Sequence, residues 1–212
     1  MNSELKYKKL YKKVWGKLEN ITPLSFDCGQ LCNAKCCTGT DNNGMLLFPG
    51  EEYLYAGKGW CSVKDTNIVL SDGYVIKLLV CGGECPRNER PLSCRIFPLI
   101  PYLNEYSRVE FRLDPRSFGI CPITRDPVKY PVEEVFIDRL YEVFPPLLKD
   151  GKVVEFIEIL SEQYDGLMDI SGSPGIDIVS RTLPIMPALI IETKNQGTLK
   201  AGASSGPFPL LR

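Results

Sequence analysis

The chain has 212 residues, of which 44% are hydrophobic and 24% are charged, and its formal net charge is -1. This near-neutral balance gives no overall attraction to nucleic acid, and no apolar run approaches the roughly 18 residues that a membrane-spanning helix needs. Nine cysteines and no histidine are present. Without imidazole, Ser-His-Asp and Cys-His catalysis are excluded, and any soft metal ion must be held by thiolates, helped at most by carboxylates.

Residues 4–19 predict a basic amphipathic helix, in which apolar side chains recur at helical spacing between lysines. We expect the apolar stripe to pack on the core and the lysines to face solvent. The alternative is a helix that docks on an acidic protein partner or on a membrane surface. No apolar stretch typical of a secretion signal is present here, so we expect a cytoplasmic protein. The stripe consists of Tyr7, Tyr11, Val14, Trp15 and Leu18.

Residues 20–44 predict a loop that carries the first cysteine cluster, in the run CGQLCNAKCC. Pro23 breaks any helix before it, and the run TGTDNNG after it is typical of turns. Cysteines spaced four apart would share one face of a helix, but they would converge equally well in a tight loop. The two adjacent cysteines cannot point the same way on regular backbone. The cluster consists of Cys28, Cys32, Cys36 and Cys37.

A β-hairpin is predicted over residues 66–80, where two β-branched runs flank an Asp72-Gly73 turn. Its second strand runs directly into Cys81, which would anchor part of the cysteine constellation to the end of a sheet. Short strands are also expected over residues 45–48 and 108–113, and a helical turn over residues 51–56.

The C-terminal half predicts two helices, over residues 131–148 and 151–168. Pro131 would occupy the tolerated first turn of the earlier helix, and Pro145-Pro146 would end it. The later helix is apolar at Val154, Ile157, Leu160 and Tyr164. Residues 171–212 lose periodicity and become rich in Gly, Ser, Ala and Pro, which predicts an irregular tail.

The second cysteine cluster consists of Cys81, Cys85, Cys94 and Cys121. Proline follows Cys85 and Cys121 directly, a step that fixes the chain after a ligand and recurs in ferredoxin-type loops. Three arginines crowd the cluster, where they would offset the negative charge of metal-bound thiolates or, alternatively, pair with ordinary carboxylates. They are Arg87, Arg90 and Arg95. The Asp114-Pro115-Arg116 turn before Cys121 is expected to brace a loop, the alternative being that it binds a substrate carboxylate.

The eight clustered cysteines are therefore candidate ligands of zinc or of an iron–sulfur cluster, because clustered thiols in a reducing compartment more often bind metal than form disulfides. Disulfides or free buried thiols are the alternative, although an odd number of cysteines argues against a complete disulfide framework. Cys61 belongs to neither cluster and is expected to be a buried or half-buried free thiol, or else an extra ligand or a redox-sensing thiol. The ligands form one site per sequence cluster or mix around one larger centre.

Three stretches of the chain resemble the putative zinc- or iron-chelating family with the CxxCxxCC-type signature, which includes flagellin lysine N-methylase. They are CGQLCNAKCC, RPLSCRIFP and the ICP around Cys121, between about residues 26 and 123. The resemblance implies that the eight clustered cysteines are the metal ligands. No glycine-rich nucleoside-binding fingerprint follows a strand, since Gly57-Lys58-Gly59 lacks the third glycine and the βαβ context. Metal binding is therefore carried over and methyl transfer is not.

Together these features predict an α+β fold in which a small antiparallel sheet supports cysteine-rich loops around the metal site. One domain would cover residues 1–170, with the cysteine motifs in 26–123 and a helical cover in 131–168, followed by the 171–212 tail. The expected function is metal chelation by cysteine thiolates. The alternatives are an iron–sulfur-dependent protein-modifying enzyme of the flagellin lysine N-methylase type and a structural-zinc module for protein interaction.

Overall fold

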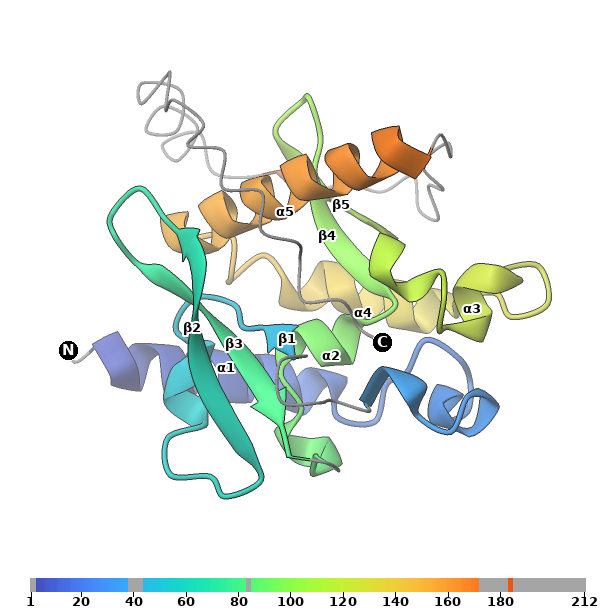
Figure 1. The fold of residues 1–212 in the computed structure, drawn as a ribbon, viewed down its shortest axis with the longest axis horizontal. Helices are drawn as coiled ribbons and strands as arrows, with labels where there is room; N and C mark the ends of the chain where they lie inside the picture. Colours follow the sequence, from blue (N-terminus) through green and yellow to red (C-terminus); the bar gives the residue numbers. More distant parts are fainter. Residues whose placement is uncertain (1–2, 38–43, 83–84, 172–182, 185–212) are drawn as a thin grey trace.

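A computed structural model describes residues 3–37, 44–82, 85–171 and 183–184. The chain is a mixture of α and β structure, with helices packed on two separate three-stranded antiparallel sheets (Figure 1). The α+β class is thus confirmed, but the expectation of one small sheet is wrong. The predicted turn after the first cysteine cluster and most of the predicted tail lie outside the described residues.

Helix α1 (Ser3–Leu18) forms as its periodicity predicts. All five residues of its apolar stripe are buried, Tyr11 completely. The Tyr11 hydroxyl donates a 2.9 Å hydrogen bond to the carbonyl of Pro49, and Trp15 Nε1 donates to the buried carboxylate of Glu51 at 2.8 Å. Because its apolar face is used inside the domain, the helix presents its lysines outward.

The first sheet has the strand order β1-β3-β2, formed by β1 (Met45–Leu46), β2 (Cys61–Val69) and β3 (Val75–Cys81). The predicted hairpin is confirmed, and Gly73 adopts the positive φ of 85° that its turn requires. Strand β2 begins earlier than predicted, at Cys61, which stands directly opposite Cys81. The central strand β3 ends at Cys81, so the sheet does lead into the second cysteine cluster.

The second sheet has the order β4-β5-β6, formed by β4 (Leu99–Leu103), β5 (Arg108–Leu113) and β6 (Leu183–Pro184). Strand β5 is confirmed with its predicted bounds. Strand β4 was not predicted, since its run carries Pro101, but an edge strand tolerates proline. Strand β6 pairs with the start of β5 and lies inside the range predicted to be irregular.

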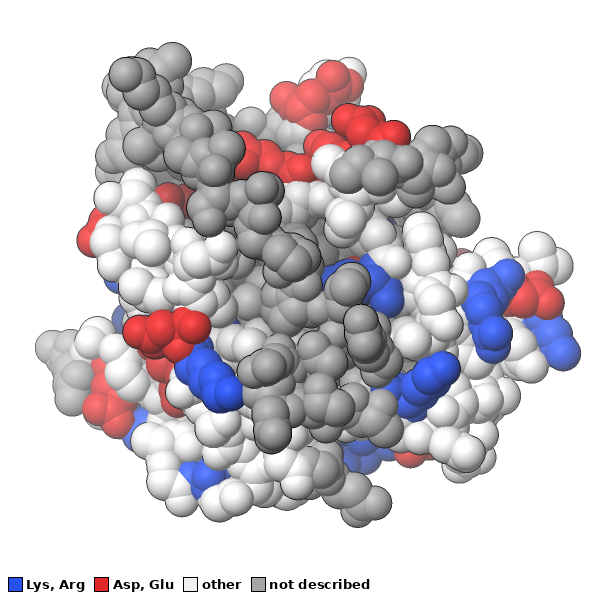
Figure 2. All heavy atoms as spheres, in the orientation of Figure 1, with Lys and Arg blue, Asp and Glu red and all other residues white. Residues whose placement is uncertain are grey.

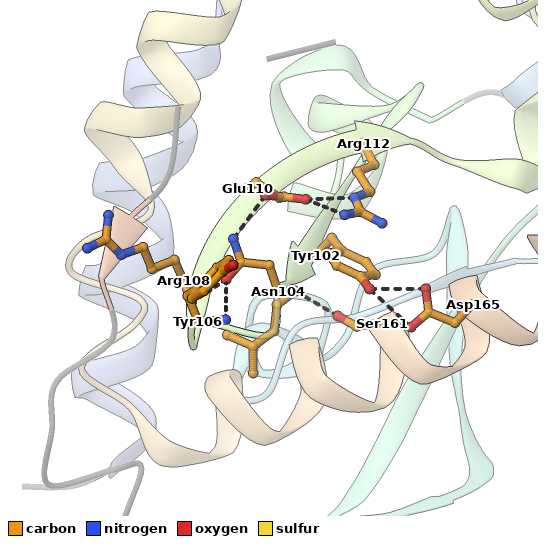
Figure 3. Close-up of polar contacts among 9 residues, drawn as sticks. Tyr102, Asn104, Tyr106, Arg108, Glu110, Arg112, Ser161 and Asp165 are labelled. Carbon is orange, nitrogen blue, oxygen red and sulfur yellow. Dashed lines mark hydrogen bonds and ion pairs between the residues drawn. The ribbon is translucent and has the colours of Figure 1, made fainter. Parts of the chain in front are cut away.

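Helix α5 (Gly151–Ser171) covers the second sheet through polar contacts as well as packing (Figure 3). The Leu103 N–H donates to Ser161 Oγ at 2.8 Å, and the Tyr102 hydroxyl lies 3.1 Å from both Asp165 carboxylate oxygens. Its four predicted apolar positions are buried. Figure 2 shows acidic side chains gathered at the top of the view, over α5 and the tip of the β4–β5 hairpin.

Helix α4 (Glu134–Val143) is shorter than predicted at both ends, with Glu133 as its N-cap and Phe144, directly before Pro145-Pro146, as its C-cap. The Glu133 N–H donates to the carbonyl of Pro23, which ties the helix start to the loop before the first cysteine cluster. Between the helices and sheets lies an aromatic core, in which the Phe48 and Phe156 rings are 5.3 Å apart and those of Phe111 and Phe144 are 4.8 Å apart.

The cysteine-bearing segments are built from short helical turns. They are η1 (Cys28–Leu31), η2 (Lys35–Cys37), η4 (Arg87–Glu89), α2 (Leu92–Ile96), η5 (Pro115–Ser117) and α3 (Pro122–Arg125), while η3 (Glu51–Leu54) follows the first strand. A second, smaller apolar cluster lies among them, formed by Leu24, Met45, Phe97, Ile120, Cys121 and Ile123. Of the helices in the described ranges, none combines the length and apolar character required to cross a bilayer.

Candidate metal centre

Six of the eight predicted ligands line one cavity of about 70 Å³, together with apolar side chains and three arginines. The six are Cys28, Cys32, Cys36, Cys37, Cys94 and Cys121. They come from three segments that are far apart in the sequence: η1 with η2, α2, and the start of α3 (Figure 1). Because pockets for organic ligands are typically several hundred Å³, a cavity of this size suits an ion or a small inorganic cluster.

The first cysteine segment folds as two tight turns and not as a continuous α-helix. The Asp27 carboxylate caps η1 by accepting a 3.1 Å hydrogen bond from the Gly29 N–H. Between the turns, Asn33 and Ala34 both adopt a positive φ of 51°. Left-handed backbone is costly for a residue with a Cβ, so this reversal is a strained feature that folds the chain back between Cys32 and Cys36.

The adjacent Cys36 and Cys37 have different neighbours, although their sulfur atoms lie 3.9 Å apart. Cys36 packs against the small apolar cluster. Cys37 lies near enough to Cys85 for each thiol to shift the pKa of the other, and the same holds for Cys85 and Cys81 at the end of β3. Through Cys37, the two predicted ligands outside the cavity lining are thus connected to those that line it.

Burial and hydrogen bonding move the thiol pKa values in opposite directions. Burial raises the pKa of Cys28 and of Cys94. Hydrogen bonds from Cys37 and Cys81, with help from Arg90, lower the pKa of Cys85. The Cys37 contact also lowers the pKa of Cys36 to about 7. The constellation therefore contains thiols that ionise readily beside thiols that stay protonated until something replaces their protons.

The three arginines have three different roles. Arg87 pairs with the Asp27 carboxylate, which joins η4 to η1. Arg95 donates to the carbonyls of Arg90 and Asn88 at 2.7 and 2.8 Å and lies over the Trp15 ring. Of the three, Arg90 is the one that interacts with the thiols. Burial lowers the pKa of Arg90, but the neighbouring Cys37, Cys85 and Cys94 outweigh this effect and raise it.

Arg90 also bears on whether a metal-bound thiolate centre fits this site. Its buried Nε atom has no hydrogen-bond partner within the described ranges. In the metal-free protein the half-buried Arg90 guanidinium faces one readily ionised thiol, Cys85, among thiols that stay protonated. Thiolates on a metal ion would add negative charge beside it, since four of them on a divalent ion leave about -2. The donor set, sulfur with a cationic neighbour, fits zinc or an iron–sulfur cluster.

Cys121 is held by the turn that precedes α3. Its N–H donates to the Ser117 carbonyl at 2.8 Å, and the Thr124 hydroxyl donates to the Cys121 carbonyl at 2.9 Å. Upstream, Asp114 and Arg116 form a buried ion pair, and Asp114 also caps η5. The predicted role of this turn in bracing the loop is confirmed.

Glu51 is a positioning residue that the sequence analysis missed. Its fully buried carboxylate accepts hydrogen bonds from Trp15 Nε1 and, at 2.6 Å, from the N–H of Leu92, the first residue of the helix that carries Cys94. Acidic residues after Pro49-Gly50 are also expected at the start of an ordinary helix. Only the three-dimensional meeting of α1, η3 and α2 distinguishes the two roles.

All nine cysteines are free thiols in the structure. Within the part of the chain that the structure describes, no three Cys, Asp or Glu side chains are placed closely enough to hold a metal ion as they stand. The structure thus gathers the predicted ligands around a cavity without a preassembled coordination sphere. Comparison with family models, with curated proteins and with solved structures returned no match for this chain.

Proposed function

We propose that this protein chelates zinc or an iron–sulfur cluster through the thiolates of the eight clustered cysteines. The observation that carries the proposal is the convergence of six of them, from three distant segments, on one small cavity. Cys81 and Cys85 extend the set through the Cys37 contact.

Two further observations support this function. Arg90 is the cation that a buried thiolate centre needs, and its buried Nε lacks a partner in the described residues. Phe97, Ile120 and Ile123 give the cavity an apolar wall, and a lower dielectric beside it strengthens the attraction between thiolates and a cation. When bound, zinc would supply a structural crosslink, whereas an iron–sulfur cluster would supply one-electron redox chemistry.

Binding requires the side chains to rotate toward a common centre, since three ligands do not stand close together at present in the described ranges. Metal binding also requires deprotonated thiols. The readily ionised Cys36 and Cys85 are suited to bind first. Thiols whose pKa is raised by burial, such as Cys28 and Cys94, would then lose their protons to the metal.

The test is the metal content of the full chain, produced in cells supplied with zinc and iron and purified without oxygen. Elemental analysis and an absorption spectrum identify the metal, because thiolate-bound iron absorbs visible light and zinc does not. We expect bound metal in the wild type, loss in Cys94→Ser and retention in Cys61→Ser. A wild-type chain without metal, or equal metal content in both variants and the wild type, contradicts the proposal.

The protein-modifying alternative needs the iron–sulfur form of this centre. A brown, oxygen-sensitive preparation favours it, whereas a colourless preparation with stoichiometric zinc leaves the structural-zinc function. A role of α1 in binding a protein partner is separable from both, since the face it presents outward is basic and its apolar stripe is buried. Exchanging its outward lysines for glutamine would abolish such binding without lowering the metal content.

A further inference from the structure

Cys61, the cysteine outside both clusters, stands directly opposite Cys81 in the antiparallel pairing of β2 with β3. Both side chains are half-buried, and β2 is an edge strand. Directly opposite residues of an antiparallel pair point to the same face of the sheet. Cys61 therefore presents its thiol beside that of a predicted metal ligand.

The hydrogen-bond pattern shows which kind of pair this is. The Gly82 N–H donates to the Trp60 carbonyl at 2.8 Å, so Trp60 and Gly82 form a hydrogen-bonded pair. Such pairs alternate with non-hydrogen-bonded ones, which makes Cys61 and Cys81 a non-hydrogen-bonded pair. The Cα atoms of such pairs are about 4.5 Å apart, within the range of about 4.4–6.8 Å that disulfides span.

A neighbouring pair of the same kind shows that side chains do reach across these strands. Asp65 lies four residues beyond Cys61 and Lys77 four residues before Cys81, so this pair is also non-hydrogen-bonded. Lys77 Nζ and Asp65 Oδ1 are 2.8 Å apart. The strands are therefore close enough at this type of position for direct contact on this face.

We propose that Cys61 and Cys81 are an oxidative modification site, at which a low-molecular-weight disulfide converts the two thiols into a cross-strand disulfide. One Cys61 thiolate attacks the reagent RSSR, forms the mixed disulfide Cys61–S–SR and expels RS⁻, which takes up the released proton. The Cys81 thiol then attacks the Cys61 sulfur, and a second RSH leaves. The two cysteines lose two electrons and two protons, and RSSR gains them.

The order of these steps follows from the placement of the two thiols. In a metal-loaded chain Cys61 is the cysteine that lies outside the proposed ligand set, so its thiol stays available to react first even though burial raises its pKa. Cys81 is its partner in register, and using it would remove one ligand from the centre. This consequence rests on the proposed function: oxidation of the pair would release metal from a loaded protein, while the disulfide itself does not require a metal to be present.

The test treats the 212-residue chain, as purified, with oxidised glutathione. Remaining thiols are blocked by alkylation, and disulfides are mapped by mass spectrometry after trypsin digestion. Trypsin places Cys61 in the peptide 59–64 and Cys81 in the peptide 78–87, which also contains Cys85. Fragment ions between Cys81 and Cys85 therefore assign the link. We expect peptides 59–64 and 78–87 to be joined through Cys81, and dithiothreitol to separate them.

A matched control moves the thiol by one residue. The double variant Cys61→Ser/Ser62→Cys keeps the composition but places the thiol on the other face of β2, opposite Val80. We expect it to lose the joined peptide and to keep its metal during oxidation, whereas the wild type gains the link and loses metal in parallel. Circular dichroism spectra that match the wild type establish that the variant is folded.

Three outcomes would overturn the inference. The first is a stable glutathione adduct on Cys61 while Cys81 stays reduced, and the second is a link from Cys61 to Cys85. The third is that the double variant forms the joined peptide as readily as the wild type. A chain that is purified without metal yet forms the Cys61–Cys81 link supports the inference and refutes the proposed function. If the Cys61–Cys81 disulfide forms in a metal-loaded chain without any loss of metal, the proposed disulfide is supported, but Cys81 is not one of the metal ligands.

Discussion

The carboxylate of Glu51 accepts a 2.6 Å hydrogen bond from the backbone N–H of Leu92, and so it fixes the start of the short helix that carries Cys94. The same carboxylate accepts from Trp15 on α1. A single buried acid thus joins the N-terminal helix to the wall of the cysteine cavity. Burial raises the pKa of this carboxyl to about 7 against the hydrogen bonds that lower it.

The raised pKa of Glu51 predicts that the protein loses stability as the pH rises from about 4.5 to about 7. In this window the folded state keeps a proton that the unfolded state has released, so the free energy of unfolding falls, by on the order of 3 kcal/mol. Urea unfolding at pH 5 and pH 8 measures the change. Glu51→Gln should flatten this slope. Trp15→Phe should lower the stability at both pH values and steepen the slope, because it removes a hydrogen bond that lowers the pKa of Glu51. Equal slopes in the wild type and Glu51→Gln would show that the carboxyl does not titrate in this range.

Mutation should separate the contributions that the Asp27–Arg87 ion pair and the Asp27 cap of η1 make to the free energy of unfolding. Arg87→Gln removes only the half-exposed ion pair, which contributes at most about 1 kcal/mol to the free energy of unfolding. Asp27→Ala also removes the cap of η1 and should cost about 1 kcal/mol more. Urea unfolding at low and high salt makes the comparison, because only the ion-pair part is screened. Identical losses in both variants would contradict a role for the cap.

Arg90 is expected to keep Cys85 reactive in the metal-free protein. The guanidinium helps to lower the pKa of this thiol, so Arg90→Gln should reduce its thiolate fraction near pH 6 and slow its alkylation. Alkylation rates of individual peptides, measured from pH 5 to pH 9, report the shift. The control is Arg125→Gln, an exposed arginine in α3, which should leave the profile unchanged. If the wild type, Arg90→Gln and Arg125→Gln show the same dependence of Cys85 alkylation on pH, Arg90 does not lower the pKa of Cys85.

Cys32 and Cys94 line the same cavity although they belong to different sequence clusters. If that cavity holds one shared centre, Cys32→Ser and Cys94→Ser should each lower metal content to the same level, and the double variant should lose no more than either. Metal counting on the three purified variants decides between one centre and two. Independent, additive losses would instead assign each cysteine to its own site.

Ala34 offers a test of backbone strain in the first cysteine segment. Its φ of 51° favours glycine, so Ala34→Gly should not destabilise the protein and should stabilise it by up to about 1 kcal/mol. The matched change Ala56→Gly, at a position without positive φ, should destabilise by a similar amount. Thermal unfolding of both variants provides the comparison. A loss of stability in both would show that the left-handed conformation at Ala34 carries no strain.

Local patterns predicted the local structure well. The stripe of Tyr7, Tyr11 and Trp15 has the 3.6-residue period of a helix with one buried face, and the structure buries that face. Asp72-Gly73 predicts a hairpin because its turn requires a positive φ, which Gly73 adopts. In contrast, β4 was not predicted, because Pro101 argues against a strand. Proline is excluded from central strands but is tolerated at the edge position that β4 occupies.

The sequence predicted eight candidate ligands, of which six line the cavity, but it did not predict how they are arranged. Cysteine spacing indicates soft-ligand chemistry, but it does not reveal that Cys36 and Cys37 have different neighbours or that Cys94 meets Cys121 across a cavity. These relations depend on how α1, the first sheet and α2 pack together. The partnership of Cys61 with Cys81 was missed for a simpler reason, since the predicted hairpin began at residue 66 and its register was not extended back to residue 61.

The spread of the cavity lining over residues 18–123 has a consequence for biosynthesis. During translation the first cysteine segment leaves the ribosome long before Cys94 and Cys121 exist. No intermediate shorter than about residue 123 can enclose the cavity, however complete its N-terminal helix and first sheet. The cysteines of the first segment are therefore made before the segments that complete the wall of their cavity.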